Sequence, residues 1–375
     1  MTEAPGVERS RGIHIAGMGR PSLRLVPLLE RRSNIGDLER FCIYGGSLLC
    51  AAMISIGLLS MAGVPPRALG AEIAAVAFSS PRALGSVLAQ TAPFLIAGLA
   101  TAIAFRATFW NIGLEGQMIF GAICASAVAI YDIGPEWFRL PLMMIAAATG
   151  GMLWIAGPGY LKLRIGVSEV ITTLLLNYVA FNLLLNQLYG PWQDPVSRFP
   201  HTEAFEAAER MPSLGWESLS WVLPFAVILM LALWWVYSIS RVGYLTDLMR
   251  SNRDMARAVG VPVLGLSVAA ILGSGAVGGL TGFAITTGVE GRMTQDFFTG
   301  ELFSGVLIAF LGRNHPLGVT FFAFFMAVLL LLGQSLQVFF QVPFSVVQLV
   351  QALFIICVAS SQFFVTYRMH WRRAA

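Results

Sequence analysis

The chain has 375 residues, of which 57% are hydrophobic and only 12% are charged. Soluble domains usually carry about 25% charged residues, and a soluble chain of this length could not bury so much apolar side chain, so the composition predicts a protein whose solvent is lipid. The formal net charge is +4, but the basic residues are scattered between apolar runs instead of forming a basic stripe with an aromatic platform, which excludes nucleic acid as a partner.

Apolar stretches of about 20 residues, the length that crosses a bilayer as a helix, recur along the chain. Nine are predicted as spans: 41–63, 87–105, 114–131, 140–160, 170–189, 219–238, 262–286, 317–336 and 345–366. A shorter apolar stretch at 303–312 is either a tenth span with its flanks, 298–313, or a re-entrant half-helix. The predicted fold is therefore an all-α polytopic membrane protein with about ten transmembrane helices, in a range of eight to ten.

The loops predict the orientation through their Lys and Arg content. With ten spans and a cytoplasmic N-terminus, 18 basic residues face the cytoplasm and 6 face outward. Nine spans would place the C-terminal Arg cluster outside, so the bias favours ten, with both termini in the cytoplasm. The expected organisation is an N-terminal tail at 1–40, a transmembrane permease domain at 41–366 and a C-terminal tail at 367–375.

Two short segments suggest an internal repeat. Gly113–Met118 reads G-L-E-G-Q-M and Gly288–Met293 reads G-V-E-G-R-M, and each follows a span rich in small residues. With ten spans the two copies lie on opposite sides of the membrane, as in the inverted repeats of many transporters. Six positions are also compatible with chance similarity, and both interpretations stay open.

The segment 105–117 places Arg, Asn, Glu and Gln between two apolar spans with almost no linker. Polar groups at membrane depth are costly and normally face a pore or a partner group. We therefore predict a break in the helices that lines a translocation pathway, with Trp110, Asn111, Glu115 and Gln117 as candidates. The alternative is an ordinary short turn with Arg106 at the membrane surface.

A second polar segment opens the span at 170–189. Ser168 is expected to cap this helix and Glu169 to interact with the positive end of its dipole. Asn177 lies deeper, followed by Asn182 and Asn186, which share one helical face. These asparagines either line the pathway or form hydrogen bonds between helices, and the sequence does not separate the two.

Two long loops offer surfaces for partners. The cytoplasmic loop 240–261 contains a charged, helix-forming core, Asp254–Ala258, which Gly260 and Pro262 would end. It is either a docking element for a soluble protein or a solvated loop. On the outer side, the loop from Gly190 to Glu217 is acidic, and would either meet a basic patch on a binding protein or simply be soluble.

Several functions are not expected because the residues that they require are not recognisable in the sequence. Lys162, the only lysine, lies between two leucines, so the chain has no P-loop and cannot itself be an ATPase of the ABC type. The four Cys and four His are spaced unlike metal ligands, so neither a metal nor a cofactor is expected. Paired carboxylates or a nucleophile with its base, which a membrane-embedded enzyme would need, are not recognisable.

Three motifs in order resemble the ABC importer permeases of the simple-sugar and nucleoside group, to which the ribose permease belongs. They are Asn111–Gln117, Gly166–Thr173 with Asn177, and Gly312–Gly318. The resemblance runs from about residue 41 to 366 and is closest to the nucleoside branch. It implies alternating access in the bacterial inner membrane, with separate ABC ATPase subunits, an extracytoplasmic substrate-binding protein and a second permease subunit, expected to be a different chain. The permease itself would not be an enzyme.

The resemblance also implies a helix that docks on the ATPase. It maps to 252–260, where the residues expected to take part are Asn252, Arg253, Asp254, Ala256, Arg257 and Gly260, with Arg241 earlier in the same loop. Ser251 and Arg253 depart from the Gly and Pro that are common at these positions in the family.

Two other transporter classes remain as alternatives at this stage. An ion-coupled secondary transporter would use Glu115, Glu169 and Glu290 as its ionisable groups. An ABC permease for branched-chain amino acids would differ only in its cargo.

Overall fold

The computed structural model describes residues 25–32, 36–216, 219–295 and 304–373. They divide into two compact units, one made of Met1–Ser47 with Ser360–Ala375 and the other of Leu48–Ala359. In the first unit, β1 (Leu25–Arg31) pairs antiparallel with β2 (Tyr367–Arg373). The sequence did not predict this ribbon, because the two segments contain few of the β-branched residues that favour strands. Helix α1 also begins inside the predicted N-terminal tail.

The long helices follow the predicted stretches, and each of the nine falls on one of them. They are α1 (Asp37–Met61), α3 (Pro81–Arg106), α4 (Leu114–Ile130), α5 (Glu136–Tyr160), α6 (Glu169–Leu188), α7 (Val222–Ser238), α10 (Val263–Ile285), α12 (Pro316–Phe340) and α13 (Phe344–Thr366). The structure adds α2 (Pro66–Phe78), which sequence reasoning missed because 13 residues are too few for a span. The all-α polytopic class is confirmed.

Length and composition identify seven of the described helices as able to cross a membrane, or eight if α7 and α8 (Arg241–Ser251), bent by 64°, count as one span. Helix α4 is apolar but has only 17 residues. Part of the predicted segment 298–313 lies outside the described residues. Its described part, α11 (Ser304–Leu311), has eight residues, or about 12 Å at the rise of an α-helix. Ten spans therefore stay a prediction.

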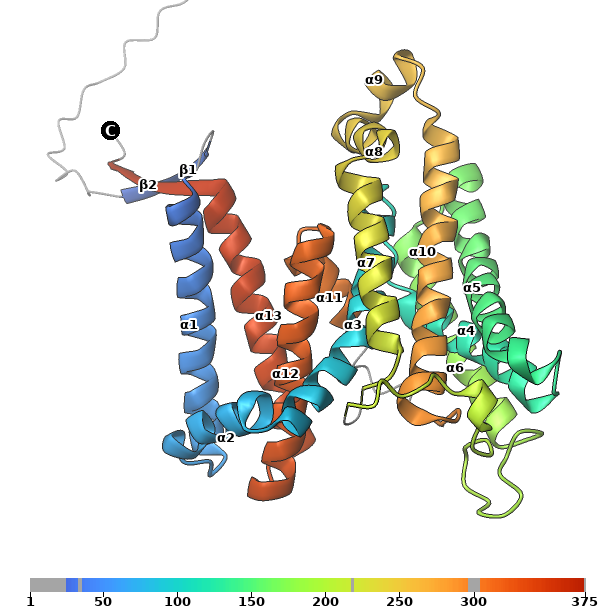
Figure 1. Ribbon diagram of the computed structural model, residues 1–375. Coiled ribbons are helices and arrows are strands. Elements are labelled where there is room, and N and C mark those ends of the chain that lie inside the picture. The colour runs from blue at the N-terminus through green and yellow to red at the C-terminus, as the bar shows by residue number, and fades with distance from the viewer. Residues whose placement is uncertain (1–24, 33–35, 217–218, 296–303, 374–375) are drawn as a thin grey trace, which may run out of the picture. The chain divides into compact units, whose positions relative to one another are not determined.

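Small residues hold the second unit together. A Cβ atom added at Gly151 of α5 would lie 2.0 Å from the carbonyl oxygen of Gly275 in α10, and one added at Gly279 would lie 2.0 Å from that of Ala147. Gly121 of α4 approaches the Cα of Gly279 in the same way, at 2.4 Å. Helices α4, α5 and α10 thus pack backbone to backbone, as helices in lipid do when small residues line the contact (Figure 1).

The packing pattern bears on the suggested inverted repeat. Helix α10 packs against both α4 and α5, while α3 packs against both α11 and α12. Helices α3 and α10 contact each other and run in opposite directions, since Ala107 after α3 and Val263 at the start of α10 share one apolar cluster. Because α3 and α10 each pack on two helices of their own and run in opposite directions, the arrangement is the one that an inverted repeat would give. However, Gly113–Met118 begins a helix whereas Gly288–Met293 begins in a π-turn and ends in an irregular bend, so duplication stays a prediction.

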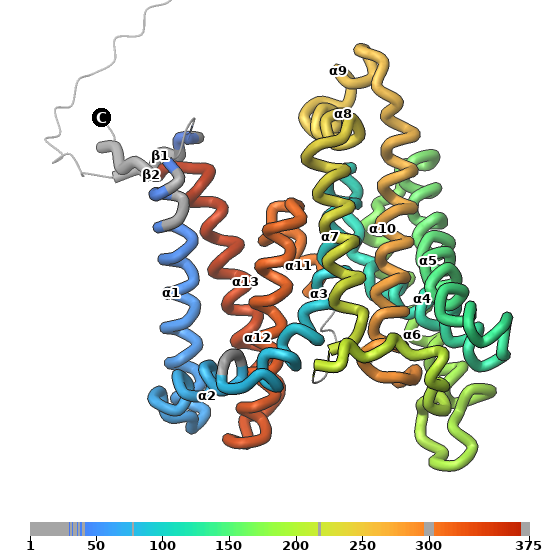
Figure 2. Tube along the Cα trace, in the orientation of Figure 1, coloured from blue at the N-terminus to red at the C-terminus, as the bar shows by residue number. Residues whose placement is uncertain are grey.

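The two ends of the second unit differ in charge. One end, here called the basic end, comprises 106–113, 161–168, 239–262 and 312–315. It gathers the residues Arg106, Lys162, Arg164, Arg241, Arg250, Arg253, Arg257 and Arg313. Figure 2 shows the trace reversing there through α8 and α9 (Arg253–Ala258), opposite the loop 189–221. These are the residues that the predicted orientation assigns to the cytoplasm.

At the opposite, acidic end, the buried Arg139 organises the long loop. Its guanidinium lies 2.9 Å from Asp132, 2.8 Å from the buried Glu209 and 3.7 Å from Glu206. These ion pairs attach the 3-10 turn η2 (Ala207–Glu209) to the start of α5. The acidic loop is therefore a folded element over its described residues.

Candidate translocation and coupling site

The chain leaves helical geometry between α3 and α4, where a reciprocal amide pair fixes it. The side-chain nitrogen of Asn111 donates to Gln117 Oε1 at 3.1 Å, and that of Gln117 donates to Asn111 Oδ1 at 2.8 Å. Asn111 also donates to Ser274 Oγ of α10 at 3.0 Å and accepts from the Gly113 N–H at 3.1 Å. All three side chains are buried. A non-helical segment between Arg106 and Leu114 is therefore observed, and its buried amides are satisfied by protein groups, while its place in a pathway stays a prediction.

The buried polar cluster of Asn111, Gln117 and Ser274 is here called the hub. Asn177 of α6 completes it from the other side. Its Oδ1 accepts from the Gly116 N–H at 2.8 Å, and its Nδ2 donates to the Ile112 carbonyl at 3.1 Å. Gly116 is in the first turn of α4, whose N-cap, Gly113, has no side chain to satisfy the free N–H groups. Asn177 therefore caps α4 from a neighbouring helix.

The glycines of the first motif allow the second motif to approach. A Cβ atom at Gly116 would lie 2.9 Å from Asn177 Oδ1, and one at Gly113 would lie 2.7 Å from the Cβ of Thr173. On α10, a Cβ at Gly278 would lie 2.9 Å from Gln117 Oε1. The two motifs, separated by about 60 residues, are thus the two halves of one contact.

The structure brings three predicted pathway residues together and separates a fourth. Asn111, Gln117 and Asn177 are 0%, 1% and 3% exposed, and Glu115 is also buried. Trp110 is 51% exposed and packs on Phe105, with ring centroids 4.9 Å apart. For Asn177, hydrogen bonding between helices is observed. Whether any of these residues also contacts cargo is a prediction that this conformation leaves untested.

The start of α6 differs from expectation in one detail. Ser168 occupies the N-cap position but its side chain makes no capping hydrogen bond. Glu169 is buried, lies 2.6 Å from Lys162 Nζ and accepts from the Trp110 N–H at 3.5 Å. The carboxylate therefore joins the break to the end of α5.

The charged loop contains the helix predicted from its sequence. Asn252 caps α9 by accepting from the N–H groups of Asp254 at 3.1 Å and Met255 at 3.0 Å, and Gly260 follows with φ +84°. Ala256 is buried in the apolar cluster that contains Ala107. Helix α9 is therefore packed on the chain that leaves α3. Helix α8, which carries Arg241 in its first turn, was not predicted.

Arg106 connects this loop with the third motif. Its Nε donates to the Asn314 carbonyl at 3.0 Å, its Nη1 lies 3.7 Å from Asp247 of α8, and the guanidinium lies 4.6 Å from the centre of the Tyr237 ring. Arg106 is 7% exposed and is therefore held among protein groups at the basic end, while its depth in the membrane, and with it the choice between a pathway break and a surface turn, stays a prediction. Sequence reasoning missed its role because its partners come from distant parts of the chain.

The third motif forms the tight turn that presents this carbonyl. A Cβ at Gly318 would lie 2.5 Å from the Gly312 carbonyl oxygen, so the ends of α11 and α12 touch through glycines. Arg313 and Asn314 both have left-handed backbone, with φ of 54° and 57°, and Pro316 starts α12. All three motifs therefore meet around the end of α3 and the start of α4.

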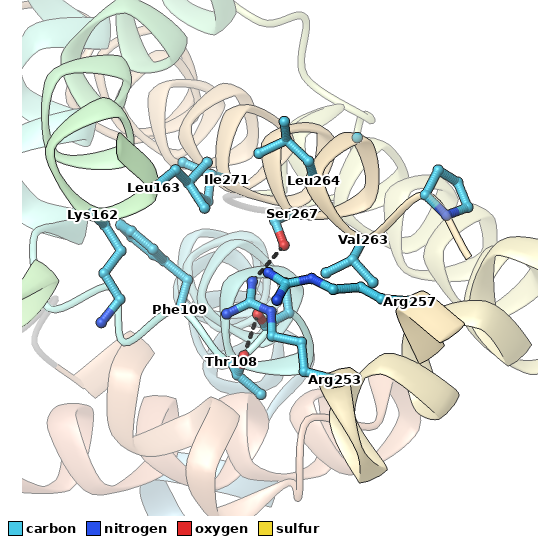
Figure 3. A pocket seen from close by; sticks show the side chains of 13 residues that line it. Thr108, Phe109, Lys162, Leu163, Arg253, Arg257, Val263, Leu264, Ser267 and Ile271 are labelled. Carbon is cyan, nitrogen blue, oxygen red and sulfur yellow. Dashed lines mark hydrogen bonds between the residues drawn. The ribbon is translucent and has the colours of Figure 1, made fainter. Parts of the chain in front are cut away.

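A cavity of about 430 Å³ lies at the basic end, beneath α9 (Figure 3). It is lined by residues from the end of α3, the end of α5, α9 and the start of α10: Ala107, Thr108, Phe109, Lys162, Leu163, Arg253, Arg257, Pro262, Val263, Leu264, Gly265, Ser267 and Ile271. Its walls combine apolar side chains with three cations.

Residues 83–359 match the family described as the branched-chain amino acid transport system permease component. The chain is 36% identical over 270 residues to the glucose ABC transporter permease protein TsgB13 of Haloferax volcanii, covering 69% of this chain and 71% of that protein. It is an ABC importer permease. The guanosine ABC transporter permease protein NupP of Bacillus subtilis is 31% identical over 255 residues, 67% of the permease described here and 73% of NupP. The nucleoside ABC transporter permease protein NupB of Lactococcus lactis is 26% identical over 231 residues, 58% and 63% of the two chains.

Family membership confirms the resemblance seen in the three motifs and a multi-pass location in the inner membrane. It does not favour the ion-coupled alternative, and the geometry gives that alternative no shared site. Glu169 is ion-paired with Lys162 at the basic end, while Glu290 is exposed at the acidic end. As an ABC permease, the chain is a transport component, and such relatives imply an ATPase and a substrate-binding protein as partners.

Proposed function

We propose that this permease forms, with a second permease subunit, the pathway for a nucleoside or simple sugar, powered by separate ATPase subunits that dock on α8 and α9. Three relatives are named for glucose, guanosine and nucleosides, which are neutral, hydrogen-bonding molecules. The polar hub of the permease consists of amides and a hydroxyl, groups that suit such cargo better than paired charges would.

The observation that carries the coupling proposal is the set of contacts made by Arg106. One guanidinium joins Asp247 in the proposed docking loop to the Asn314 carbonyl and sits at the end of the helix that leads into the hub. A shift of α8 on ATPase closure would therefore act directly on the end of α3. Five residues along the chain, the reciprocal amide pair begins at Asn111.

For the pathway we propose Trp110, Asn111, Glu115, Gln117 and Asn177. In the described conformation the amides are paired with one another, which is expected of a closed state. Opening would require the Asn111–Gln117 pair to separate or to move as a unit past α6. In that state the freed amide groups would be available to hydroxyls of the cargo.

The second permease subunit is proposed to cover α6. Its outward face carries exposed apolar side chains together with Asn182 and Asn186. Asn182 donates only to the Tyr178 carbonyl of its own helix, at 2.7 Å, so it does not tie α6 to another described helix. Amides on a lipid-facing surface are costly, and a second subunit enclosing an aqueous pathway would remove that cost.

The proposal is tested by reconstituting the permease with its ATPase, binding protein and second permease in proteoliposomes. Uptake of labelled guanosine or glucose should require ATP and the binding protein, and leucine should not be taken up. Uptake of leucine alone would contradict the proposed cargo, and uptake that persists without the ATPase would contradict the proposed energy source.

The coupling role is tested with Arg106→Gln. We expect the basal rate of ATP hydrolysis to stay unchanged. Cargo-stimulated hydrolysis and uptake should fall about tenfold or more, since a buried charged hydrogen bond is lost. Arg164→Gln, which removes an exposed charge from the basic end outside α8 and α9, is the control and should leave the ratio of uptake to hydrolysis unchanged. Equal effects of both variants would show that only the overall charge of the basic end matters.

A further inference from the structure

The cavity beneath α9 has no role in the pathway proposed above, yet it has the chemistry of a binding site. Three cationic side chains line it, Lys162, Arg253 and Arg257; Lys162 is paired with Glu169 at 2.6 Å, and the described lining itself contains no carboxylate. Its volume of about 430 Å³ lies within the range of about 300–1,000 Å³ that is usual for small-molecule sites. Figure 3 shows Arg253 and Arg257 reaching into it from α9.

The two arginines are incompletely neutralised by the protein. They stand four residues apart on α9, a spacing at which like charges lie on one face and repel. Arg257 pairs only weakly, at 3.5 Å, with Asp254, and both side chains are well exposed. Arg253 donates to Ser267 Oγ at 2.8 Å, while its Nε is buried without a hydrogen-bond partner among the described residues.

The remaining wall decides the class of ligand. The guanidinium groups have a fork geometry that matches phosphate oxygens, whereas the lining hydroxyls of Thr108 and Ser267 donate to the Ala107 carbonyl and to Met249 Sδ. Phe109, Leu163 and Ile271 supply an apolar wall beside them. An inorganic anion would use only the polar half of this lining, whereas a phosphate attached to an organic group would use both.

We propose that this cavity binds a phosphate-bearing organic ligand and that occupancy regulates coupling. The ligand is either a soluble phosphate monoester or the headgroup of an anionic phospholipid. It would tie α9, through Arg253 and Arg257, to the lining segment 107–109, which leads into the hub. A bound ligand therefore stiffens the link between the docking loop and α3. This site is separate from the pathway and does not depend on what the permease carries.

Binding is measured on the full chain in nanodiscs of phosphatidylcholine, titrated by calorimetry with guanosine 5′-monophosphate and with glucose 6-phosphate. We expect saturable binding that Arg257→Gln weakens about tenfold, the usual effect of losing one charge-assisted hydrogen bond. Because the Arg257 side chain is 63% exposed, this variant should fold normally, which an unchanged thermal midpoint without ligand verifies. Arg253→Gln should weaken binding as well but also loses the bond to Ser267.

The second arm replaces part of the phosphatidylcholine with phosphatidylglycerol. If the natural ligand is a lipid headgroup, the soluble esters will not bind, and phosphatidylglycerol will raise the thermal midpoint of the wild type but not of Arg257→Gln. The matched control in both arms is Arg250→Gln, an exposed arginine of the same loop that does not line the cavity. The proposal is overturned if neither source binds, or if Arg250→Gln weakens binding as much as Arg257→Gln.

Discussion

Helix α10 has two halves that meet different surroundings. In its second half, Gly279 lies so close to α5 that a single added carbon would be 2.0 Å from the Ala147 carbonyl oxygen. In its first turns, Gly265 lines the cavity beneath α9, and an added carbon would meet nothing within 4 Å. One half is fixed by backbone contact, while the other borders the cavity that we propose as a ligand site and the loop that we propose as the docking element.

The contrast separates a closely packed part of the permease from a part that borders open space. Dense helix contacts through glycine have essentially one arrangement, because protein interiors resist even small changes in volume. Around the cavity, by contrast, a carbon added at Gly265 would have room. The hub lies between the two, with its amides satisfied but held by hydrogen bonds that can be exchanged.

The largest effect is expected from a glycine-to-alanine substitution in the second half of α10, compared with the same substitution in its first turns. Gly279→Ala forces α5 and α10 apart and should lower stability by about 3 kcal/mol or more, at the upper end of the usual cost of overpacking, because the atom that the added carbon meets belongs to the backbone. Gly265→Ala should leave stability unchanged or slightly higher, because alanine favours a helix over glycine. Thermal midpoints in detergent measure both. Equal losses would mean that the glycine contact between α5 and α10 is not what holds the scaffold.

An intermediate effect is expected at the hub. Asn111→Ala and Gln117→Ala each leave a buried amide unpaired, at a cost of about 1–3 kcal/mol. The double variant should cost clearly less than the sum, because the two amides are each other's main partners. Trp110→Ala combined with Gln117→Ala is the control, and its effects should add, since Trp110 does not join the amide pair. Stability and uptake are measured together, and uptake loss without stability loss would favour direct contact with cargo.

The smallest effect is expected at the basic end, in the pH dependence of stability that His315 contributes. Burial, and to a lesser extent the positive charge of Arg106, lowers the pKa of His315 below its usual value. The folded protein therefore binds a proton at His315 less readily than the unfolded chain. The free energy of unfolding is unaffected above a pH of about 6.5 and falls as the pH is lowered below it. Thermal midpoints between neutral and mildly acidic pH should fall slightly less in His315→Gln. An identical profile for both proteins would contradict the pKa direction.

Much of the fold was accessible from hydropathy, because a bilayer imposes helix length and apolar composition on each span separately. The ranges of all nine clear stretches, the helix of the charged loop and the break at 105–117 followed from local sequence. The ribbon of β1 and β2, helix α2 and helix α8 did not, since none has the length or periodicity that local reasoning recognises. The missing hydrogen bond at Ser168 shows the same limit, because a residue type that often caps helices does not by itself fix the orientation of its side chain.

The sequence by itself determined that this is a membrane protein. It also determined the positions of the long helices and the three motifs that resemble the family. Only the tertiary structure decided what the motifs do to one another. Asn177 caps α4, Gly116 makes room for it, and Arg106 reaches Asp247 and Asn314, although these residues come from separate helices. Spans are specified residue by residue through transfer into lipid, whereas a buried polar group finds its partner only when distant segments pack together.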